Sequence, residues 1–327
     1  MVASLDQVVS QEAGDNRLAV FDWTGLSALN SPGCFACGGI QFGGQLLTSG
    51  ETYFDQGLAC PASQAGVPGL DALGYPNTWC GLGPQEAGPI PLGDACVSIG
   101  LAAGVTSCPE SGIATNADFI SQAFYSQGEV WTAVNTIVVQ EFQHGSSEDH
   151  LGVAYWGVNT DFSHHGAPDF SFAAQGYVSA AHEDLEFPSL AATQGSVLMA
   201  FTLSGNGGPT GADNGGFYPS TAYVMLSNGW FGFGQNTIHI SALGQSPQDG
   251  FTEYQGYSAT YGTLTTRPRW GDYSQATFDP STGKFVFASE MIQAPKCSDS
   301  TFSADPTCGG TRAQQANWGS SINSIFP

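Results

Sequence analysis

The chain has 327 residues, of which 28 are acidic and only six are basic, so its formal net charge at pH 7 is −22. A chain this acidic is repelled by the phosphates of nucleic acids and by anionic membranes, which argues against nucleic-acid binding. Hydrophobic residues make up 41% of the sequence, which excludes global disorder, and no run of about 18 apolar residues predicts a transmembrane helix.

Residues 1–33 are predicted to contain the strands of a partial β-sheet. The segment RLAVFDWTGL at 17–26 resembles the third strand of the units that follow later in the chain. No basic region followed by an apolar core is present here, so no signal peptide is visible. Because the cysteines described next indicate export, we expect the chain to be a mature piece of a longer exported protein.

Residues 34–117 are predicted to be a cysteine-rich insertion stapled by disulfides. Cys34 and Cys37 form a CxxC without a second CxxC, a close histidine pair or a thioredoxin-like setting, so disulfides are favoured over zinc or redox chemistry. Cys297 and Cys308 flank a short loop and are expected to pair with each other. The fifteen possible pairings of the other six remain open: Cys34, Cys37, Cys60, Cys80, Cys96 and Cys108. Disulfides predict an extracellular, secreted or cell-surface location.

Residues 118–327 contain three copies of one hairpin pattern. Gly128, Gly195 and Gly283 are each followed by one polar residue and then an apolar run with alanine at the fifth place. These alanines are Ala133, Ala200 and Ala288. A strand with small residues precedes each glycine, and a third strand is predicted after each hairpin, at 151–158, 220–227 and 317–326. A fourth strand is predicted twice, at 175–181 and 236–244.

A four-stranded antiparallel unit repeated in this way is typical of β-propeller blades, which must stack because a single blade cannot bury both faces. Helix signals are scarce, so the fold class is all-β. The alternative is a β-sandwich with similar hairpins. Three to four blades make an incomplete ring, which either another polypeptide or further copies of this chain would complete, since open strand edges invite association.

Several motifs support a family resemblance: RLAVFDWTGLSAL, PLGDAC at 91–96, SQAFYSQGEVWTAVNT, LGVAYWGV, QGYVSA, FPSLAAT, VLMAFTLSG, YPSTAYVML, QDGFTEY at 248–254, RWGDYS and ANWGSSI. In this order they resemble a group of large exported bacterial proteins of uncharacterised function with a predicted β-propeller. RWGDYS is the most specific motif, and the resemblance covers about residues 17–327. It implies secretion and a propeller but no reaction, and the CFACGG segment lies outside the shared pattern.

One acidic residue precedes the first strand of each predicted blade: Asp118, Glu186 and Asp272. Carboxylates that converge on a propeller axis could serve as acid and base in a glycosidase, or as oxygen ligands for calcium. They could also cap turns by accepting backbone hydrogen bonds. Arg269, beside Trp270, is expected to neutralise such channel carboxylates, with Asp272 as its natural partner.

Four histidines lie near acidic residues on predicted connections, at 144, 150, 164 and 165, and they could hold a metal or be ordinary loop residues. Four tryptophans are candidates for stacking on sugars: Trp131, Trp156, Trp230 and Trp270. No metalloprotease helix motif or serine-hydrolase elbow occurs.

Three functions follow from the sequence. The first is a structural or interaction scaffold at a surface, in a matrix or in a filament, with a second polypeptide or another copy as partner. The second is a carbohydrate hydrolase that uses Asp118, Glu186 and Asp272. The third is a binding module for glycans or cations, with calcium the only cofactor considered.

Overall fold

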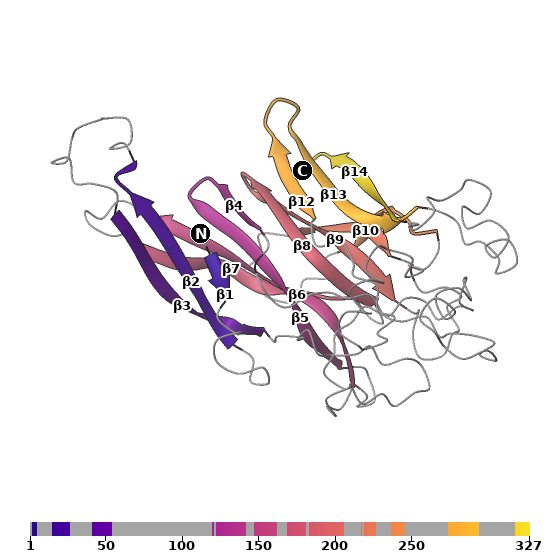
Figure 1. Ribbon diagram of the computed structural model, residues 1–327, viewed down its shortest axis with the longest axis horizontal. Helices are drawn as coiled ribbons and strands as arrows, with labels where there is room; N and C mark the ends of the chain where they lie inside the picture. The colour runs from indigo at the N-terminus through magenta and orange to yellow at the C-terminus, as the bar shows by residue number, and fades with distance from the viewer. Residues whose placement is uncertain are drawn as a thin grey trace, which may run out of the picture.

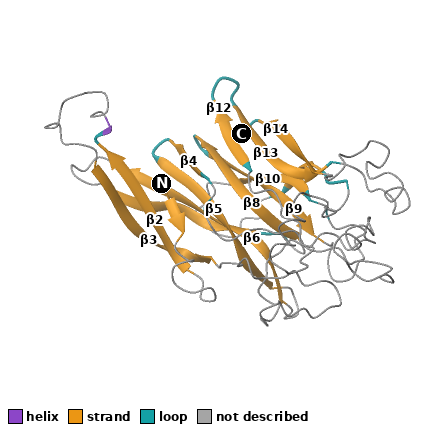
Figure 2. Cartoon of the chain, viewed as in Figure 1, coloured by secondary structure: helices purple, strands orange, loops and turns teal. Residues whose placement is uncertain are grey.

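The computed structural model describes residues 2–4, 15–26, 41–53, 120, 122–141, 147–161, 169–180, 183–205, 217, 219–226, 237–245, 274–293 and 318–327. Nearly all of these residues lie in β-strands (Figure 2), so the all-β prediction is confirmed for the described part. No helix within these ranges has the length and apolar character needed to span a membrane.

The strands form four antiparallel sheets in which sequential strands are neighbours. Sheet 1 consists of β1 (Val2–Ser4), β2 (Asp15–Thr24) and β3 (Gln41–Tyr53). Sheet 2 consists of β4 (Ala123–Ser126), β5 (Glu129–Glu141), β6 (Ser147–Asp161) and β7 (Asp169–Val178). Sheet 3 consists of β8 (Glu183–Thr193), β9 (Ser196–Gly205), β10 (Ser220–Leu226) and β11 (His239–Ala242). Sheet 4 consists of β12 (Gln275–Asp279), β13 (Lys284–Ile292) and β14 (Trp318–Ile325).

The three repeated glycines close the hairpins β4–β5, β8–β9 and β12–β13. Gly128, Gly195 and Gly283 have positive φ angles of 90°, 81° and 69°, which glycine adopts without the steric penalty that a Cβ brings. A Cβ built at any of the three meets nothing within 4 Å, so the backbone angle alone selects glycine there. The predicted hairpins are therefore present where the glycine pattern placed them.

The sheets are stacked face to face in a row, from sheet 1 to sheet 4 (Figure 1). Between sheets 1 and 2, Leu18 and Leu47 pack with Trp156. Between sheets 2 and 3, Trp131 and Val153 belong to the same buried cluster as Met199 and other residues of sheet 3. Between sheets 3 and 4, Leu198 and Ala200 pack with Phe285 and Phe287. The hydrophobic core is thus three layers between successive sheets.

The position of a residue after the turn glycine determines which neighbouring sheet its side chain faces. The third and fifth residues after the turn glycine face the next sheet in the row: Trp131 and Ala133 in β5, Leu198 and Ala200 in β9. The second and fourth residues after Gly195 and Gly283 face the previous sheet: Val197 and Met199 in β9, Phe285 and Phe287 in β13. Alternation along a strand then directs Val286 and Ala288 of β13 away from sheet 3.

Polar side chains also join sheets 1 and 2. The side-chain amide of Gln45 in β3 bonds both backbone groups of Phe170 in β7: Nε2 donates to the carbonyl at 3.2 Å, and Oε1 accepts from the N–H at 3.0 Å. The Ser49 hydroxyl donates to Oε1 of Gln175 at 2.9 Å and accepts from Nε1 of Trp156 at 2.8 Å. These contacts fix the relative positions of β3 and sheet 2.

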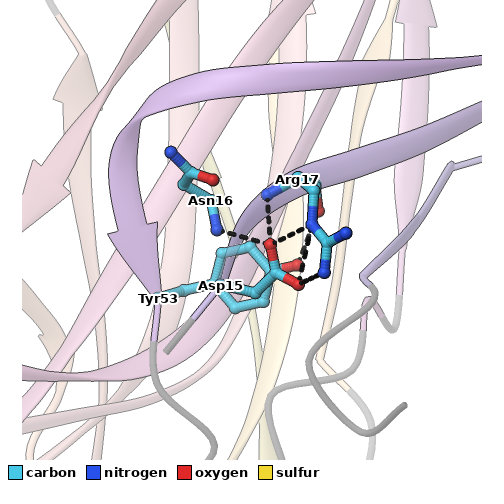
Figure 3. Close-up of polar contacts among 4 residues, drawn as sticks. All are labelled: Asp15, Asn16, Arg17 and Tyr53. Atoms are coloured by element: carbon cyan, nitrogen blue, oxygen red, sulfur yellow. Dashed lines mark hydrogen bonds and ion pairs between the residues drawn. The ribbon is translucent and has the colours of Figure 1, made fainter. Parts of the chain in front are cut away.

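A compact polar group holds the start of β2 against the end of β3 (Figure 3). The Arg17 guanidinium pairs with the Asp15 carboxylate, and Oδ1 of Asp15 also accepts from the backbone N–H groups of Asn16 and Arg17. These bonds, led by the one from the Arg17 side chain, lower the pKa of Asp15. The Tyr53 hydroxyl donates to the Arg17 carbonyl at 2.6 Å. The pairing of β2 with β3 shifts register between Asp15 and Arg17, and these hydrogen bonds stabilise the irregular backbone there.

The structure differs from the expected segment boundaries in one place. Residues 41–53, expected to belong to the cysteine-rich insertion at 34–117, form β3 of sheet 1, so the first unit extends past residue 33. Glycines at 43, 44 and 50 interrupt the alternating pattern of this strand and obscure it in the sequence. Gly44 lies opposite Phe21, whose ring occupies the space that a side chain would take.

Candidate functional site

Glu186 is the only candidate acid within the described residues. Asp118, Arg269, Trp270, Asp272 and all eight cysteines lie outside them, so convergence of the three carboxylates stays a prediction. Among the histidines, the side chain of His239 is described; it stacks on Tyr223 with ring centroids 5.1 Å apart. Within the described ranges, no group of three or more His, Cys, Asp or Glu side chains could hold a metal ion.

Glu186 lies in β8, opposite Thr202 of β9, and its side chain has no exposed surface. The Ser204 hydroxyl donates to its Oε1 at 3.0 Å. Its Oε2 is buried and finds no hydrogen-bond partner within the described part of the chain. An ionised carboxylate is costly in such a place, because water is excluded and none of the described residues forms an ion pair with it.

Burial therefore raises the pKa of Glu186 well above its ordinary value of 4.5. The negative charge of nearby Asp184 raises the pKa further, while the hydrogen bond from Ser204 acts in the opposite direction. Asp184 is itself buried, and its Oδ1 accepts from the backbone N–H of Leu151 at 2.6 Å. The site thus combines a carboxyl group that favours its protonated form with a carboxylate that joins sheet 3 to sheet 2.

The backbone next to Glu186 is irregular. Phe187 has a positive φ of 53°, and the pairing of β8 with β9 shifts register between Glu186 and Ser189. A positive φ is unfavourable for a bulky residue and persists where the surroundings hold it. Here the N–H of Phe187 donates to Oδ1 of Asn135 at 3.0 Å, and its ring packs on Ile292. The bulge is thereby anchored to sheet 2 on one side and to sheet 4 on the other.

Beyond the bulge, β8 contacts the first strands of both neighbouring sheets. The Ser189 hydroxyl donates to Oε1 of Gln122, just before β4. Nε2 of Gln122 in turn donates to the carbonyl of Ala276 in β12 at 3.1 Å. Ser189 and Ala276 have no exposed surface. Small residues at these positions let three strands from three sheets come together.

Chemically, the arrangement around Glu186 can hold a proton and join sheets, but Glu186 is fully enclosed. The sequence pattern predicted Glu186 just before a strand, whereas it lies within β8. The pattern gave no indication of its neighbours Ser204 and Asp184. Ser204 carried no signal, because a serine near the end of an apolar strand is unremarkable in composition. Asp184 lies two residues before Glu186, a spacing that puts both side chains on one face of a strand and could have been noticed.

The tryptophan prediction is wrong for the two residues that are described. Trp131 and Trp156 are core residues, with exposed fractions of 5% and 0%. The ring of Trp131 packs over Gly157 on the paired strand. Gly157 has no side chain, so the ring fits against the backbone there. Trp230 and Trp270 lie outside the described residues. Trp23 and Phe42 are among the exposed aromatic residues, with Tyr125 and Phe326, and they pair across β2 and β3 with ring centroids 5.0 Å apart.

No protein-family model matches the chain, and no curated protein matches it. The chain is similar to four chains of known structure, two of which are as follows. One is Parainfluenza Virus 5 hemagglutinin-neuraminidase with the ligand DANA, with a TM-score of 0.32 and 11% identity over 63% of this chain and 46% of that chain. The other is the ectodomain of the Parainfluenza Virus 5 hemagglutinin-neuraminidase, with a TM-score of 0.31 and 11% identity over 62% and 41%. The chain thus spans less than half of each, and the arrangement described above rests on its own strand pairing and sheet contacts.

Proposed function

We propose that the protein is an extracellular interaction scaffold built from propeller-like blades, whose terminal sheets dock a macromolecular partner. The observation that carries this proposal is the contrast between the two kinds of surface. The one described candidate carboxyl group, Glu186, is fully enclosed, whereas large apolar side chains are exposed on both terminal sheets. A scaffold needs exposed faces and no open catalytic pocket.

The exposed residues are of the kind that interfaces bury. Trp23 and Phe42 on sheet 1 are 57% and 55% exposed, and Ile322 on sheet 4 is 76% exposed. Soluble monomers rarely leave contiguous apolar patches uncovered, and aromatic residues are enriched where proteins bind. Extracellular placement is supported by the eight cysteines, which suit an oxidising compartment.

Hydroxyl-radical footprinting tests this proposal by comparing material from the protein's natural source with the purified chain. We expect Trp23, Phe42 or Ile322 to be protected in the native material and reactive in the purified chain at a concentration low enough to keep it monomeric. Mass spectrometry of the same material should find the cysteines oxidised and the protein outside the cell. Equal reactivity in both samples, or reduced cysteines in an intracellular fraction, would contradict the proposal.

Binding or hydrolysis of glycans is the second candidate, and the exposed pair Trp23 and Phe42 is the observation that favours binding, because aromatic faces stack on sugar rings. The acidic chain suits neutral rather than anionic glycans. A panel of neutral oligosaccharides, read by tryptophan fluorescence with Trp23→Ala as the matched control, separates this function from the scaffold. Turnover that disappears in Glu186→Gln would instead support the hydrolase.

A further inference from the structure

One recurring position of the repeat has no neighbouring sheet among the described residues. In sheets 2 and 3, the fifth residue after the turn glycine is an alanine buried under the next sheet: Ala133 is 2% exposed and Ala200 is 0% exposed. In sheet 4 the equivalent residue, Ala288, lies on the face turned away from sheet 3 and is only half-buried. No described sheet follows sheet 4 in the row.

This face of sheet 4, which we call the trailing face, keeps the chemistry of a sheet-to-sheet contact. Its strands pair Val286 with Ser324 and Ala288 with Ile322. Alanine at the fifth place makes room for the first strand of the next sheet in both inner contacts, where β8 and β12 pack. In β12 the same face carries the exposed Gln275 and Thr277, which pair with Ala288 and Val286. The trailing face thus has a small and apolar centre, formed by Val286, Ala288 and Ile322, beside a polar first strand.

The opposite end of the row has the complementary surface. In sheet 1, Leu18, Val20 and Leu47 face sheet 2, so their neighbours along the strands face away from it. The outward residues form what we call the leading face: Phe21, Trp23, Phe42 and Leu46. Phe21 and Phe42 stack with ring centroids 5.4 Å apart, and Trp23 adjoins Phe42. No described sheet precedes sheet 1 in the row (Figure 1).

We infer that the leading face of one copy of this chain docks on the trailing face of a second copy, head to tail. This inference rests on the proposed scaffold function and names its partner. All three internal contacts have the same polarity, with the trailing side of one sheet against the leading side of the next, and the proposed contact continues that series. A head-to-tail contact between identical chains closes into a ring where the rotation allows and otherwise grows into a filament.

The net charge of the chain determines how this self-association depends on salt. Each copy carries a formal charge of −22, so two copies repel each other at low ionic strength. The Debye length falls from about 30 Å at 0.01 M salt to about 3 Å at 1 M, so added salt screens this repulsion while the apolar contact persists. Association should therefore increase with salt, opposite to an interface held by ion pairs.

The test is sedimentation velocity on the full chain with two single-face variants. Ile322→Glu disables the trailing face and Trp23→Glu the leading face; Ser324→Glu and Leu46→Glu are second variants for the same faces. Burying the new carboxylate should raise the Kd by on the order of tenfold or more. Leu243→Glu is the matched control, because Leu243 is 51% exposed but lies beside sheet 3 rather than on a terminal face. Circular dichroism checks that each variant folds.

The unaltered chain and Leu243→Glu should form oligomers whose size grows with concentration and salt. Each single-face variant should be monomeric alone, and an equimolar mixture of the two should form a one-to-one dimer that grows no further, because only one competent pair of faces remains. Oligomers formed by either variant alone would overturn the head-to-tail contact. A chain that stays monomeric throughout, while its faces are protected in native material, would overturn self-association and leave the scaffold proposal standing.

Discussion

The side chain of Gln122 donates a hydrogen bond to the carbonyl of Ala276, at 3.1 Å, although the two residues belong to sheets that are not neighbours in the row. Sheet 3 lies between them, and its Ser189 donates to the same side chain. One amide thus ties together the first strands of three sheets. The backbone carbonyl of Gln122 also accepts a hydrogen bond from Oγ1 of Thr132, at 2.8 Å.

Replacing Gln122 with alanine should lower the free energy of unfolding by about 1–3 kcal/mol, because the buried Ser189 hydroxyl and the Ala276 carbonyl lose their shared partner. Urea unfolding followed by tryptophan fluorescence measures this change. Gln41→Ala is the control, since Gln41 is exposed at the start of β3 and should shift stability by less than about 0.5 kcal/mol. Equal effects of the two substitutions would mean that Gln122 does not join the sheets.

Glu186→Gln should remove a pH-dependent loss of folding stability. Below the ordinary pKa of 4.5 both folded and unfolded chains hold this proton, so the substitution has little effect there. As the pH rises above 4.5, the unfolded chain releases the proton while the folded chain keeps it, and the stability of the unaltered protein falls by up to about 1.4 kcal/mol per pH unit for this one group. The variant lacks this loss.

Thermal unfolding of the two proteins between pH 4 and pH 8 measures that effect. The difference in Tm should grow in favour of Glu186→Gln as the pH rises. Asp169→Asn serves as the control, because Asp169 is an exposed carboxylate at the start of β7. A difference in Tm that is constant across this range would show that Glu186 is ionised in the folded protein.

Gly195→Ala should destabilise the protein by about 1 kcal/mol through the backbone alone, because the added Cβ meets nothing within 4 Å while φ is 81°. Gly195→Asn should cost less, since asparagine tolerates the left-handed region. Equilibrium unfolding of both variants gives the ranking. If alanine and asparagine were equally costly, the turn would be selected by something other than its backbone angle.

Asp279 should titrate at an unusually low pH. Its carboxylate accepts from the Ser281 hydroxyl and from Thr282 Oγ1, each at 2.7 Å, and these bonds, the one from Ser281 first, lower its pKa from 3.8 to about 2. The turn is thus stabilised above pH 3.8, and this contribution is lost as the pH falls through about 2. Carboxyl NMR of selectively labelled protein measures the pKa, which Ser281→Ala should raise. A midpoint near 3.8 in the unaltered chain would contradict these hydrogen bonds.

The hairpins could be predicted from the sequence because their signals are local. A glycine with positive φ and a fixed alternation after it determine where Gly128, Gly195 and Gly283 lie and which side Ala133 and Ala200 face. The course of β3 could not be predicted, because the space at its glycines is filled by side chains from elsewhere in the fold: Asp22 at Gly43, Phe21 at Gly44 and Gln175 at Gly50. Those contacts are known only once the strands are paired and the sheets are stacked.

The burial of Glu186 could not be predicted from the sequence either. Four consecutive residues at the start of β8, from Glu183 to Glu186, include three acids, a composition typical of an exposed connection. In the fold all four are buried, because sheets 2 and 4 cover sheet 3 on both sides. A residue's distance from water in a stack of sheets depends on which sheets flank it, and no stretch of a dozen residues encodes that.

The paired bonds between Gln45 and Phe170 have a consequence for how the protein behaves at high concentration. The exposed margin of a β-sheet is a template on which further strands can polymerise, and charge or side-chain cover commonly blocks it. The Gln45 amide bonds both the N–H and the carbonyl of Phe170, as the peptide unit of an added strand would. A strand from another chain therefore cannot pair with β7 at this residue. Fibril seeding along β7 is thereby hindered at its first residues, without any cost in charge.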